Sequence, residues 1–302
     1  MRVRRTQVCG RRVWSTPRVL DARSDPRGGA RSLRFRNGER RRVTLRDGSV
    51  PPLRLDDDAY VERAYHTTLA AAIRASGGQW TGSDYYARPA DIVAEINRVS
   101  ATALRVSLRD LTPLSEVAGL WHLDVGSDGS PALGSVSTLT GLRSLHLSVR
   151  GIRGVVDPSS LPELRWLTTP LGGKGGAPIL ASLAQGHPTI EHLRIRETKI
   201  RSISEIVANL PRLQSFSVSY ADFIRSPGDL APVADTLTEL RMWMVPGLRS
   251  LEGIETALRL ERLSLSSGAI TDLNPLAALP NLREVDITMA GGVRITDVKD
   301  LR

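Results

Sequence analysis

The chain has 302 residues with a formal net charge of +9, and 41% of its residues are hydrophobic while only 4% are aromatic. A chain of this size can bury a core as one large or two small domains, but that core has to be aliphatic, which disfavours a globule built around packed aromatic rings. The positive charge comes from residues 1–50, which hold 15 Arg against four acidic residues, so the basic balance does not by itself indicate a nucleic-acid-binding fold.

Residues 1–31 are rich in Arg, Ser, Gly and Pro and have no apolar periodicity, which predicts a disordered basic extension. Residues 32–54 alternate apolar and polar positions around an Asn-Gly pair, which predicts a short basic hairpin. Two interpretations of this segment stay open: binding to nucleic acid or an acidic partner, or a solvated or artefactual extension. We favour the second, because only Trp14 and Phe35 interleave the arginines as stacking aromatics.

Cysteine usage and hydropathy predict where the protein works. Cys9 is the only cysteine, so an intrachain disulfide is excluded and a reducing compartment is favoured. No apolar run follows the basic N-terminus, and no segment approaches the length of a membrane span. We therefore expect a soluble, cytoplasmic protein that does not insert into membranes.

Residues 55–100 predict a small helical N-terminal cap. Apolar residues recur at helical spacing within 57–75, between an acidic start and a Gly-Gly pair. A second helix is expected to begin near residue 89, with Ile92, Val93 and Ile96 on its apolar face. We expect these helices to cover the first open edge of the structure that follows.

From residue 101 to residue 302 one pattern, L-x-x-L-x-L, recurs eight times at spacings of 22, 22, 26, 23, 24, 23 and 22 residues. The matches begin at Leu120, Leu142, Leu164, Ile190, Leu213, Leu237, Leu260 and Leu282. Such a period is the signature of stacked repeats, each a strand, a turn and a return. A degenerate unit at 106–114 precedes them, and 295–301 resembles the return half of a coil, so we expect about nine coils with the last one incomplete.

With these motifs, residues 101–302 resemble the leucine-rich-repeat family, and the short units resemble the type found in bacterial internalins. The resemblance implies a bacterial α/β solenoid, a right-handed superhelix with a concave parallel sheet that binds a protein partner. One feature departs from the family pattern, because the usual Asn eight residues after the first Leu is missing. That position holds Asp128, Arg150, Gly172, Thr198, Ala221, Val245, Gly268 and Ala290. The ladder of Asn side-chain hydrogen bonds is therefore not expected in the convex turns.

Alternation along each strand assigns a second set of side chains to the concave face. Large aromatics and Arg are enriched in binding hot spots, and on this basis we predict one ligand-binding surface. It consists of Trp166, His192, Arg194, Arg196, Tyr220, Arg241 and Trp243. The alternative is that the rings pack against neighbouring side chains.

Other candidate chemistry is weaker. Asp124 and His146 fall in one column of adjacent strands, with His122 diagonal to them, and we favour a structural pair over a metal site or a catalytic dyad. The glycine-rich run 172–176 lacks the remaining residues of a phosphate-binding loop, and we expect a flexible insertion that lengthens its repeat. The sequence therefore predicts a protein-protein interaction module, with no enzymatic activity and no cofactor or metal; the alternative is a nucleic-acid-associated protein that uses its Arg-rich N-terminal segment.

Overall fold

The computed structural model describes residues 54–55, 79–82, 93–94, 96–97, 100–106, 110–127, 133–149, 154, 156–172, 175–266, 270, 272–288 and 294–295. The chain divides into two compact units, residues 1–53 and 54–302, and only the second is described here. The predicted basic extension, most of the predicted hairpin and the predicted helix at 57–75 lie outside the described residues.

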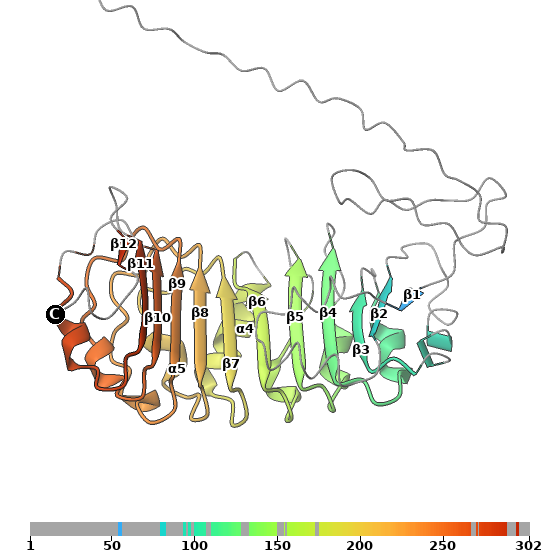
Figure 1. The fold of residues 1–302 in the computed structure, drawn as a ribbon. Coiled ribbons are helices and arrows are strands. Elements are labelled where there is room, and N and C mark those ends of the chain that lie inside the picture. The colour runs from blue at the N-terminus through green and yellow to red at the C-terminus, as the bar shows by residue number, and fades with distance from the viewer. Residues whose placement is uncertain are drawn as a thin grey trace, which may run out of the picture. The chain divides into compact units, whose positions relative to one another are not determined.

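One sheet of 12 strands, stacked in the order of the sequence, runs through the second unit (Figure 1). Its strands are β1 (Arg54–Leu55), β2 (Gln79–Gly82), β3 (Ala103–Val106), β4 (His122–Ser127), β5 (Ser144–Val149), β6 (Trp166–Pro170), β7 (His192–Arg196), β8 (Ser215–Ser219), β9 (Glu239–Trp243), β10 (Arg262–Ser266), β11 (Glu284–Thr288) and β12 (Arg294–Ile295). Neighbours from β2 to β11 pair in parallel, whereas β1 and β12 pair antiparallel at the two ends. The predicted leucine-rich-repeat solenoid is confirmed.

The second and third positions of each L-x-x-L-x-L motif form the inner face of the sheet. In β7, Leu193 and Ile195 are buried, and they are in register with Phe216 and Val218 of β8, which are also buried. Residues between them point the other way, because side chains alternate in a strand. The motif therefore predicted the strand positions and the register.

Short helical turns return the chain behind the sheet. They are η1 (Thr112–Glu116), η2 (Gly134–Thr138), η3 (Pro158–Ser160), α4 (Gly176–Gln185), α5 (Ser204–Val207), η4 (Ala231–Val233), η5 (Ile254–Thr256) and η6 (Asn274–Ala278). Four of the described 3-10 turns have Pro at their first or second position, where its fixed φ suits the turn and its missing N–H is not needed. The core lies between these turns and the inner face of the sheet, since both contribute fully buried aliphatic side chains.

The longest repeat contains α4, a helix of ten residues that starts at Gly176, the last residue of the predicted flexible insertion; residues 173–174 of that insertion lie outside the described residues. Ile179 and Leu183, four residues apart, are both fully buried, so the extra length packs one apolar helix face against the core. Gly176 permits the sharp entry into this helix, because a Cβ there would overlap the Leu171 carbonyl. Glycine in this segment therefore serves close packing.

The missing Asn ladder is replaced by packing in the middle of the stack. Thr198, Ala221 and Val245 occupy the usual Asn position after β7, β8 and β9, and all three are buried. Only Thr198 contributes a weak side-chain bond there, with its Oγ1 3.4 Å from the backbone N of Ile200. These turns are held by apolar burial where the family pattern uses amide hydrogen bonds.

Both ends of the sheet correct the sequence interpretation. Within the region assigned to a helical cap, Gln79–Gly82 forms β2 and pairs with β3 over four residues. The segment near Ile295, interpreted as the return half of a coil, forms β12 and pairs antiparallel with Ile287 and Thr288. Both strands give hydrogen-bond partners to backbone groups that an edge strand leaves unpaired, a tertiary effect that periodicity does not reveal.

Residues 93–94 and 96–97 are helical, with Val93 and Ile96 buried on the predicted apolar face. That this helix caps the solenoid stays a prediction.

In the described part of the chain, none of the helices is long and apolar enough to cross a membrane.

Candidate binding surface

The predicted site residues lie on the outer face of the sheet, which is the face opposite the aliphatic core and the one that the sequence analysis assigned to the concave side. Three columns of this face run across β6, β7, β8 and β9. The first holds Trp166, His192, Ser215 and Glu239, the second Thr168, Arg194, Ser217 and Arg241, and the third Pro170, Arg196, Ser219 and Trp243. Tyr220 follows directly after β8. The structure thus brings these residues to one face, and their role as ligand contacts stays a prediction.

At the β4–β5 part of the outer face, polar side chains are buried although the alternation predicted exposure. His122 and Ser144 are almost fully buried, and the ring Nδ1 of His122 lies 2.7 Å from the Ser144 hydroxyl. Burial lowers the pKa of His122 from 6.5 to about 3, because the charged form loses its hydration. His122 is therefore neutral at physiological pH.

Beside this pair, Asp124, His146 and Ser148 lie in the order of a catalytic triad. The Ser148 hydroxyl is 2.8 Å from Nε2 of His146, and Asp124 Oδ2 is 4.0 Å from Nδ1 of the same ring. Burial is the main cause that lowers the pKa of His146 to about 3. The charge of His122 in its protonated form and the charges of Arg196, Arg194 and Arg105 lower it further.

This arrangement is poorly suited to catalysis. A general base works best with a pKa near the operating pH, and 4.0 Å is too long for a hydrogen bond that orients the ring. Asp124 also pairs with Arg105 at 3.6 Å. No group of three His, Cys, Asp or Glu side chains that could hold a metal ion occurs among the described residues. Asp124 and His146 thus lie close together, and a structural role for this pair stays a prediction.

Trp166 is half-buried and packs on its neighbour. Its ring stacks on His192, with centroids 5.5 Å apart and planes within 4°, which fits the alternative that the predicted rings pack against other side chains. The indole Nε1 is buried without a hydrogen-bond partner in the described structure. Trp166 is therefore engaged with His192, and its role as a ligand contact stays a prediction.

Arg196 donates a hydrogen bond to the Leu147 carbonyl, which has no backbone donor because residue 170 is proline. The ladder pattern, in which Trp166 N donates to Arg143 O, would continue with residue 170 donating to Leu147 O, but proline has no N–H. The β5–β6 pairing accordingly ends at His146 and Thr168. Arg196 Nη2 reaches across β6 and donates to Leu147 O at 3.1 Å. Part of this predicted ligand contact is thus structural.

We expect Arg196→Gln to destabilise the fold by ~1 to 3 kcal/mol, the usual cost of leaving a buried acceptor unsatisfied. In a Pro170→Ala background the new N–H can donate to Leu147 O, so the same change should cost clearly less. Urea unfolding of the four proteins in this double-mutant cycle measures the coupling. Equal costs in both backgrounds would contradict the assignment of Arg196 to the missing bond.

Glu239 organises a second polar group on β8–β10. Its carboxylate is almost fully buried, accepts from the Ser215 hydroxyl at 2.9 Å and from Arg241 Nε at 2.6 Å, and lies 3.8 Å from Arg262 Nη2. Burial alone would raise the pKa of Glu239, but Arg241, Ser215 and Arg262 together hold it below the usual value. Arg241 is thus an ion-pair partner whose side chain is still 56% exposed.

Beyond these groups, β9–β11 carry a shallow groove of about 440 Å³ on the outer face. Its lining consists of Glu239, Arg241, Arg262, Leu263, Ser264, Glu284, Val285 and Asp286. The charges in this lining have both signs, so the groove indicates no single class of ligand.

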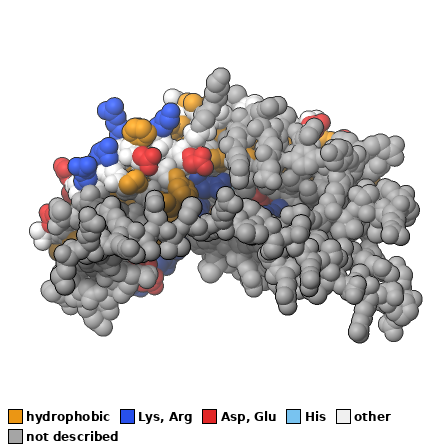
Figure 2. All heavy atoms as spheres, turned by 90° about the horizontal axis from the view of Figure 1, so that it is seen from above, with side chains coloured by type: hydrophobic (Ala, Val, Ile, Leu, Met, Phe, Trp, Pro, Cys, Tyr) orange, Lys and Arg blue, Asp and Glu red, His pale blue; other side chains and the backbone are white. Residues whose placement is uncertain are grey.

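Four apolar side chains at the carboxyl ends of β8 and β9 are exposed: Tyr220, Phe223, Trp243 and Met244. We call them the edge cluster. Between 48% and 56% of each is accessible to solvent, and Tyr220 N donates to Trp243 O at 3.1 Å, which joins the two strand ends. Figure 2 views the carboxyl ends of the strands and shows hydrophobic side chains interspersed with Arg, Lys and acidic groups. Sequence reasoning found Tyr220 and Trp243 but missed Phe223 and Met244, which stand outside the strand alternation.

The residue that follows each of β7, β8 and β9 has a left-handed backbone conformation. Glu197, Tyr220 and Met244 follow β7, β8 and β9 with φ of 56°, 56° and 51°. Non-glycine residues enter this region at a cost of ~1 to 2 kcal/mol, and Asn and Gly are favoured there. The repeat geometry imposes the conformation, and in two coils the chain places a bulky apolar residue in it.

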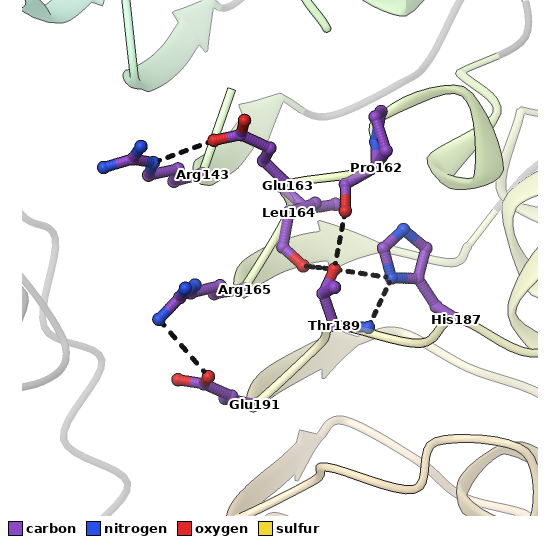
Figure 3. Close-up of polar contacts among 8 residues, drawn as sticks. All are labelled: Arg143, Pro162, Glu163, Leu164, Arg165, His187, Thr189 and Glu191. Carbon is purple, nitrogen blue, oxygen red and sulfur yellow. Dashed lines mark hydrogen bonds and ion pairs between the residues drawn. The ribbon is translucent and has the colours of Figure 1, made fainter. Parts of the chain in front are cut away.

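Polar contacts lie at the amino ends of β5, β6 and β7 (Figure 3). The Thr189 hydroxyl donates to the carbonyls of Leu164 at 2.8 Å and Pro162 at 3.1 Å. Exposed ion pairs join Arg143 to Glu163 and Arg165 to Glu191, and such pairs contribute little to stability. Among the described residues, four of the five exposed large apolar side chains lie at the carboxyl edge, and the fifth, Leu258, precedes β10.

Comparison with known proteins supports the fold. No protein-family model matches the chain, and no curated protein matches it significantly. An internalin (inlF) from Listeria monocytogenes aligns with a TM-score of 0.50 and 20% identity over 77% of this chain and 68% of that chain. Internalin C2 from the same species aligns with a TM-score of 0.42 and 18% identity over 70% of this chain and 80% of that chain. Together with the eight repeats and the parallel sheet, the first likeness shows that this chain folds as a leucine-rich-repeat protein.

Proposed function

We propose that the chain is a non-catalytic module that binds a protein partner through the outer face of β6–β9 and the edge cluster. The leucine-rich-repeat fold supports an interaction module in general. The neutral, weakly basic His146 supports a role other than catalysis. The single cysteine supports a cytoplasmic setting, which is part of the proposal.

One observation carries this proposal: the fold maintains Tyr220 and Met244 in a costly state. Each has a left-handed backbone and each leaves about half of an apolar side chain in water. Asn or Gly at either place would remove both costs. Strained and exposed residues of this kind cluster at ligand-binding sites, so a contact with a partner accounts for their retention.

The neighbours of these residues fit a binding hot spot. Trp243 is 56% exposed and joins Tyr220 through the backbone bond between their strands. Arg241, two residues before Trp243, lies on the same face with its charge partly balanced by Glu239. Tyr, Trp and Arg dominate the energetics of protein interfaces.

A matched pair of variants tests the proposal. Tyr220→Asn and Met244→Asn should leave the fold as stable as the parent, or up to ~1 kcal/mol more stable, because strain is relieved. Together they should weaken capture of the natural partner at least tenfold. Thermal unfolding gives the first result, and quantitative capture from cells by the full chain gives the second.

Arg201→Asn serves as the control, since Arg201 is exposed on the return side of its coil. It should change neither stability nor capture. Unchanged capture by the double variant would show that the edge cluster is not the binding surface. The alternative function, nucleic-acid binding by the Arg-rich segment, concerns residues outside the described part of the chain.

A further inference from the structure

The edge cluster by itself is too small to hold a second folded protein. About half of each of its four side chains is exposed, and large side chains of this kind bury roughly 150 to 250 Å² each. The exposed apolar area is therefore on the order of 300 to 500 Å², whereas a stable complex needs about 800 Å² from each partner. Protein interfaces surround an apolar centre with a polar rim. The polar groups beside the edge cluster thus determine which partner fits.

Arg225 and Arg249 stand beside this cluster, in the turns that follow β8 and β9. Arg225 comes two residues after Phe223, and Arg249 comes five residues after Met244. The backbone N of Arg249 donates to the Arg225 carbonyl at 3.0 Å, so the two residues hold the same position in neighbouring coils, and both are exposed. Arg201 holds this position in the coil of β7, where, among the described residues, no large apolar side chain is exposed.

The guanidinium group of Arg225 is held between the two turns. Its Nη1 donates to the Asp222 backbone carbonyl at 3.3 Å. The same nitrogen lies over Gly247, because a Cβ at that position would overlap both Arg225 Nη1 and the Asp222 carbonyl oxygen. A side chain that is already positioned loses less conformational entropy on binding than a free one. Arg225 is therefore prepared to contact a group that lies on the edge cluster.

The rim beside the edge cluster has an excess of positive charge. Neither Arg225 nor Arg249 forms an ion pair with a described residue. Asp222 is the only acidic residue in the turns 220–225 and 244–249, so two Arg against one Asp give these turns a formal net charge of +1. Figure 2 shows Lys and Arg side chains along one rim of the carboxyl edge, next to hydrophobic side chains. Like charges in neighbouring coils repel each other, and an anion between them replaces this repulsion with attraction.

We propose that Arg225 and Arg249 bind an acidic group, carboxylate or phosphate, on the segment of the partner protein whose apolar side chains rest on the edge cluster. The inference rests on the proposed function and specifies the chemistry of the partner. One acidic group can contact both guanidinium groups, because neighbouring coils are ~4.8 Å apart and Arg binds pairs of carboxylate or phosphate oxygens. A second copy of this chain fits less well, since two apolar centres of this size bury less than a stable dimer needs.

Subtractive selection from a phage library of short random peptides tests this arrangement. The library is first depleted on the immobilised double variant Arg225→Gln/Arg249→Gln, which removes peptides that bind elsewhere, including those that bind the Arg-rich residues 1–50. Peptides then recovered on the parent protein should combine large apolar residues with Asp or Glu. Arg212→Gln is the control, because Arg212 is exposed at the amino end of β8. Depletion on this variant should leave no peptide that the parent recovers.

A recovered peptide is then synthesised with glutamate, glutamine or phosphoserine at its acidic position, and its Kd is measured by isothermal titration calorimetry. The glutamate form should bind the parent about tenfold more tightly than the glutamine form, and the double variant should bind both forms equally. Asp222→Asn removes the acidic side chain of these turns and should tighten binding of the glutamate form alone. The order of the glutamate and phosphoserine forms distinguishes a carboxylate from a phosphate as the natural group. Circular dichroism checks that each variant is folded.

The outcomes separate this subsite from the proposed function. If depletion on the arginine variant leaves nothing to recover, while depletion on Tyr220→Asn/Met244→Asn still leaves apolar peptides, the subsite is wrong and the edge cluster stands. Acidic peptides that bind Tyr220→Asn/Met244→Asn as tightly as the parent would overturn the edge cluster as the anchor and leave the subsite. No recovery after either depletion would count against both. Phosphatidylserine vesicles or oligothymidylate that bind the parent more tightly than any peptide, and fail to bind the arginine variant, would exclude a protein segment as the occupant.

Discussion

Leu193→Asp is expected to abolish folding. Leu193 is 2% exposed and sits on the inner face of β7, in register with Leu167 and Phe216. A buried carboxylate without a partner costs several kcal/mol, a large fraction of the stability of a typical domain. Each coil is stabilised by its neighbours, so damage in the middle spreads both ways. Circular dichroism and gel filtration should report an unfolded or aggregated chain.

Ser217→Asp is the matched control for that experiment. It introduces the same side chain on the next strand, but on the outer face between Arg194 and Arg241. There the carboxylate has cations on both sides and keeps contact with solvent, since Ser217 is half-buried. Stability should be unchanged or slightly higher. Equal damage from both substitutions would refute the register of the sheet.

Acid should destabilise the protein well above the pH at which carboxylates titrate. His122 and His146 have pKa values of about 3 in the fold, below the value near 6.5 of the unfolded chain. Their contribution to stability is therefore complete above pH 6.5 and is lost as the pH falls from 6.5 towards 3. Each histidine contributes a slope of up to ~1.4 kcal/mol per pH unit.

Urea unfolding at pH 7 and pH 5 measures this effect. We expect the free energy of unfolding to fall by roughly 2 to 4 kcal/mol between these values, a window that stays above the titration of Glu239. The double variant His122→Gln and His146→Gln keeps side-chain hydrogen bonding to the serines and removes the titration. Its stability should fall clearly less between pH 7 and pH 5, and the remaining loss is assigned to His187, whose pKa is also lowered by burial. An equally steep loss in the variant would assign the acid sensitivity to other groups.

The repeat itself was predictable because it depends on local alternation. Leucines such as Leu193 and Leu240 marked the inner face of every full strand, and the sequence period set the register that brought Arg194, Ser217 and Arg241 into one column. The same alternation buries the inner side chains and aligns the strand backbones for pairing. Local and global preferences agree, so the pattern was sufficient.

The parts that could not be predicted depend on neighbours or on backbone conformation. The burial of His122 and Ser144 on the outer face does not follow from alternation, which describes only the two sides of a strand. Met244 joined the candidate surface because the repeat turn forces a positive φ after β9. The role of Arg196 depends on Pro170, which has no N–H to donate to the Leu147 carbonyl. Arg196 donates to this carbonyl from β7, two strands away. The repeat pattern of the sequence reveals none of these features.

The interrupted ladder between β5 and β6 also has a mechanical meaning. Three residue pairs join these strands, whereas six join β4 to β5 and five join β6 to β7. Of these three junctions, β5–β6 has the shortest ladder and so the fewest backbone hydrogen bonds that resist separation of its strands. Arg196 on β7 adds a side-chain hydrogen bond to Leu147 O of β5, across β6. The β5–β6 junction therefore depends in part on a side chain of a third strand, so a change at Arg196 on β7 should loosen two strands that it does not belong to.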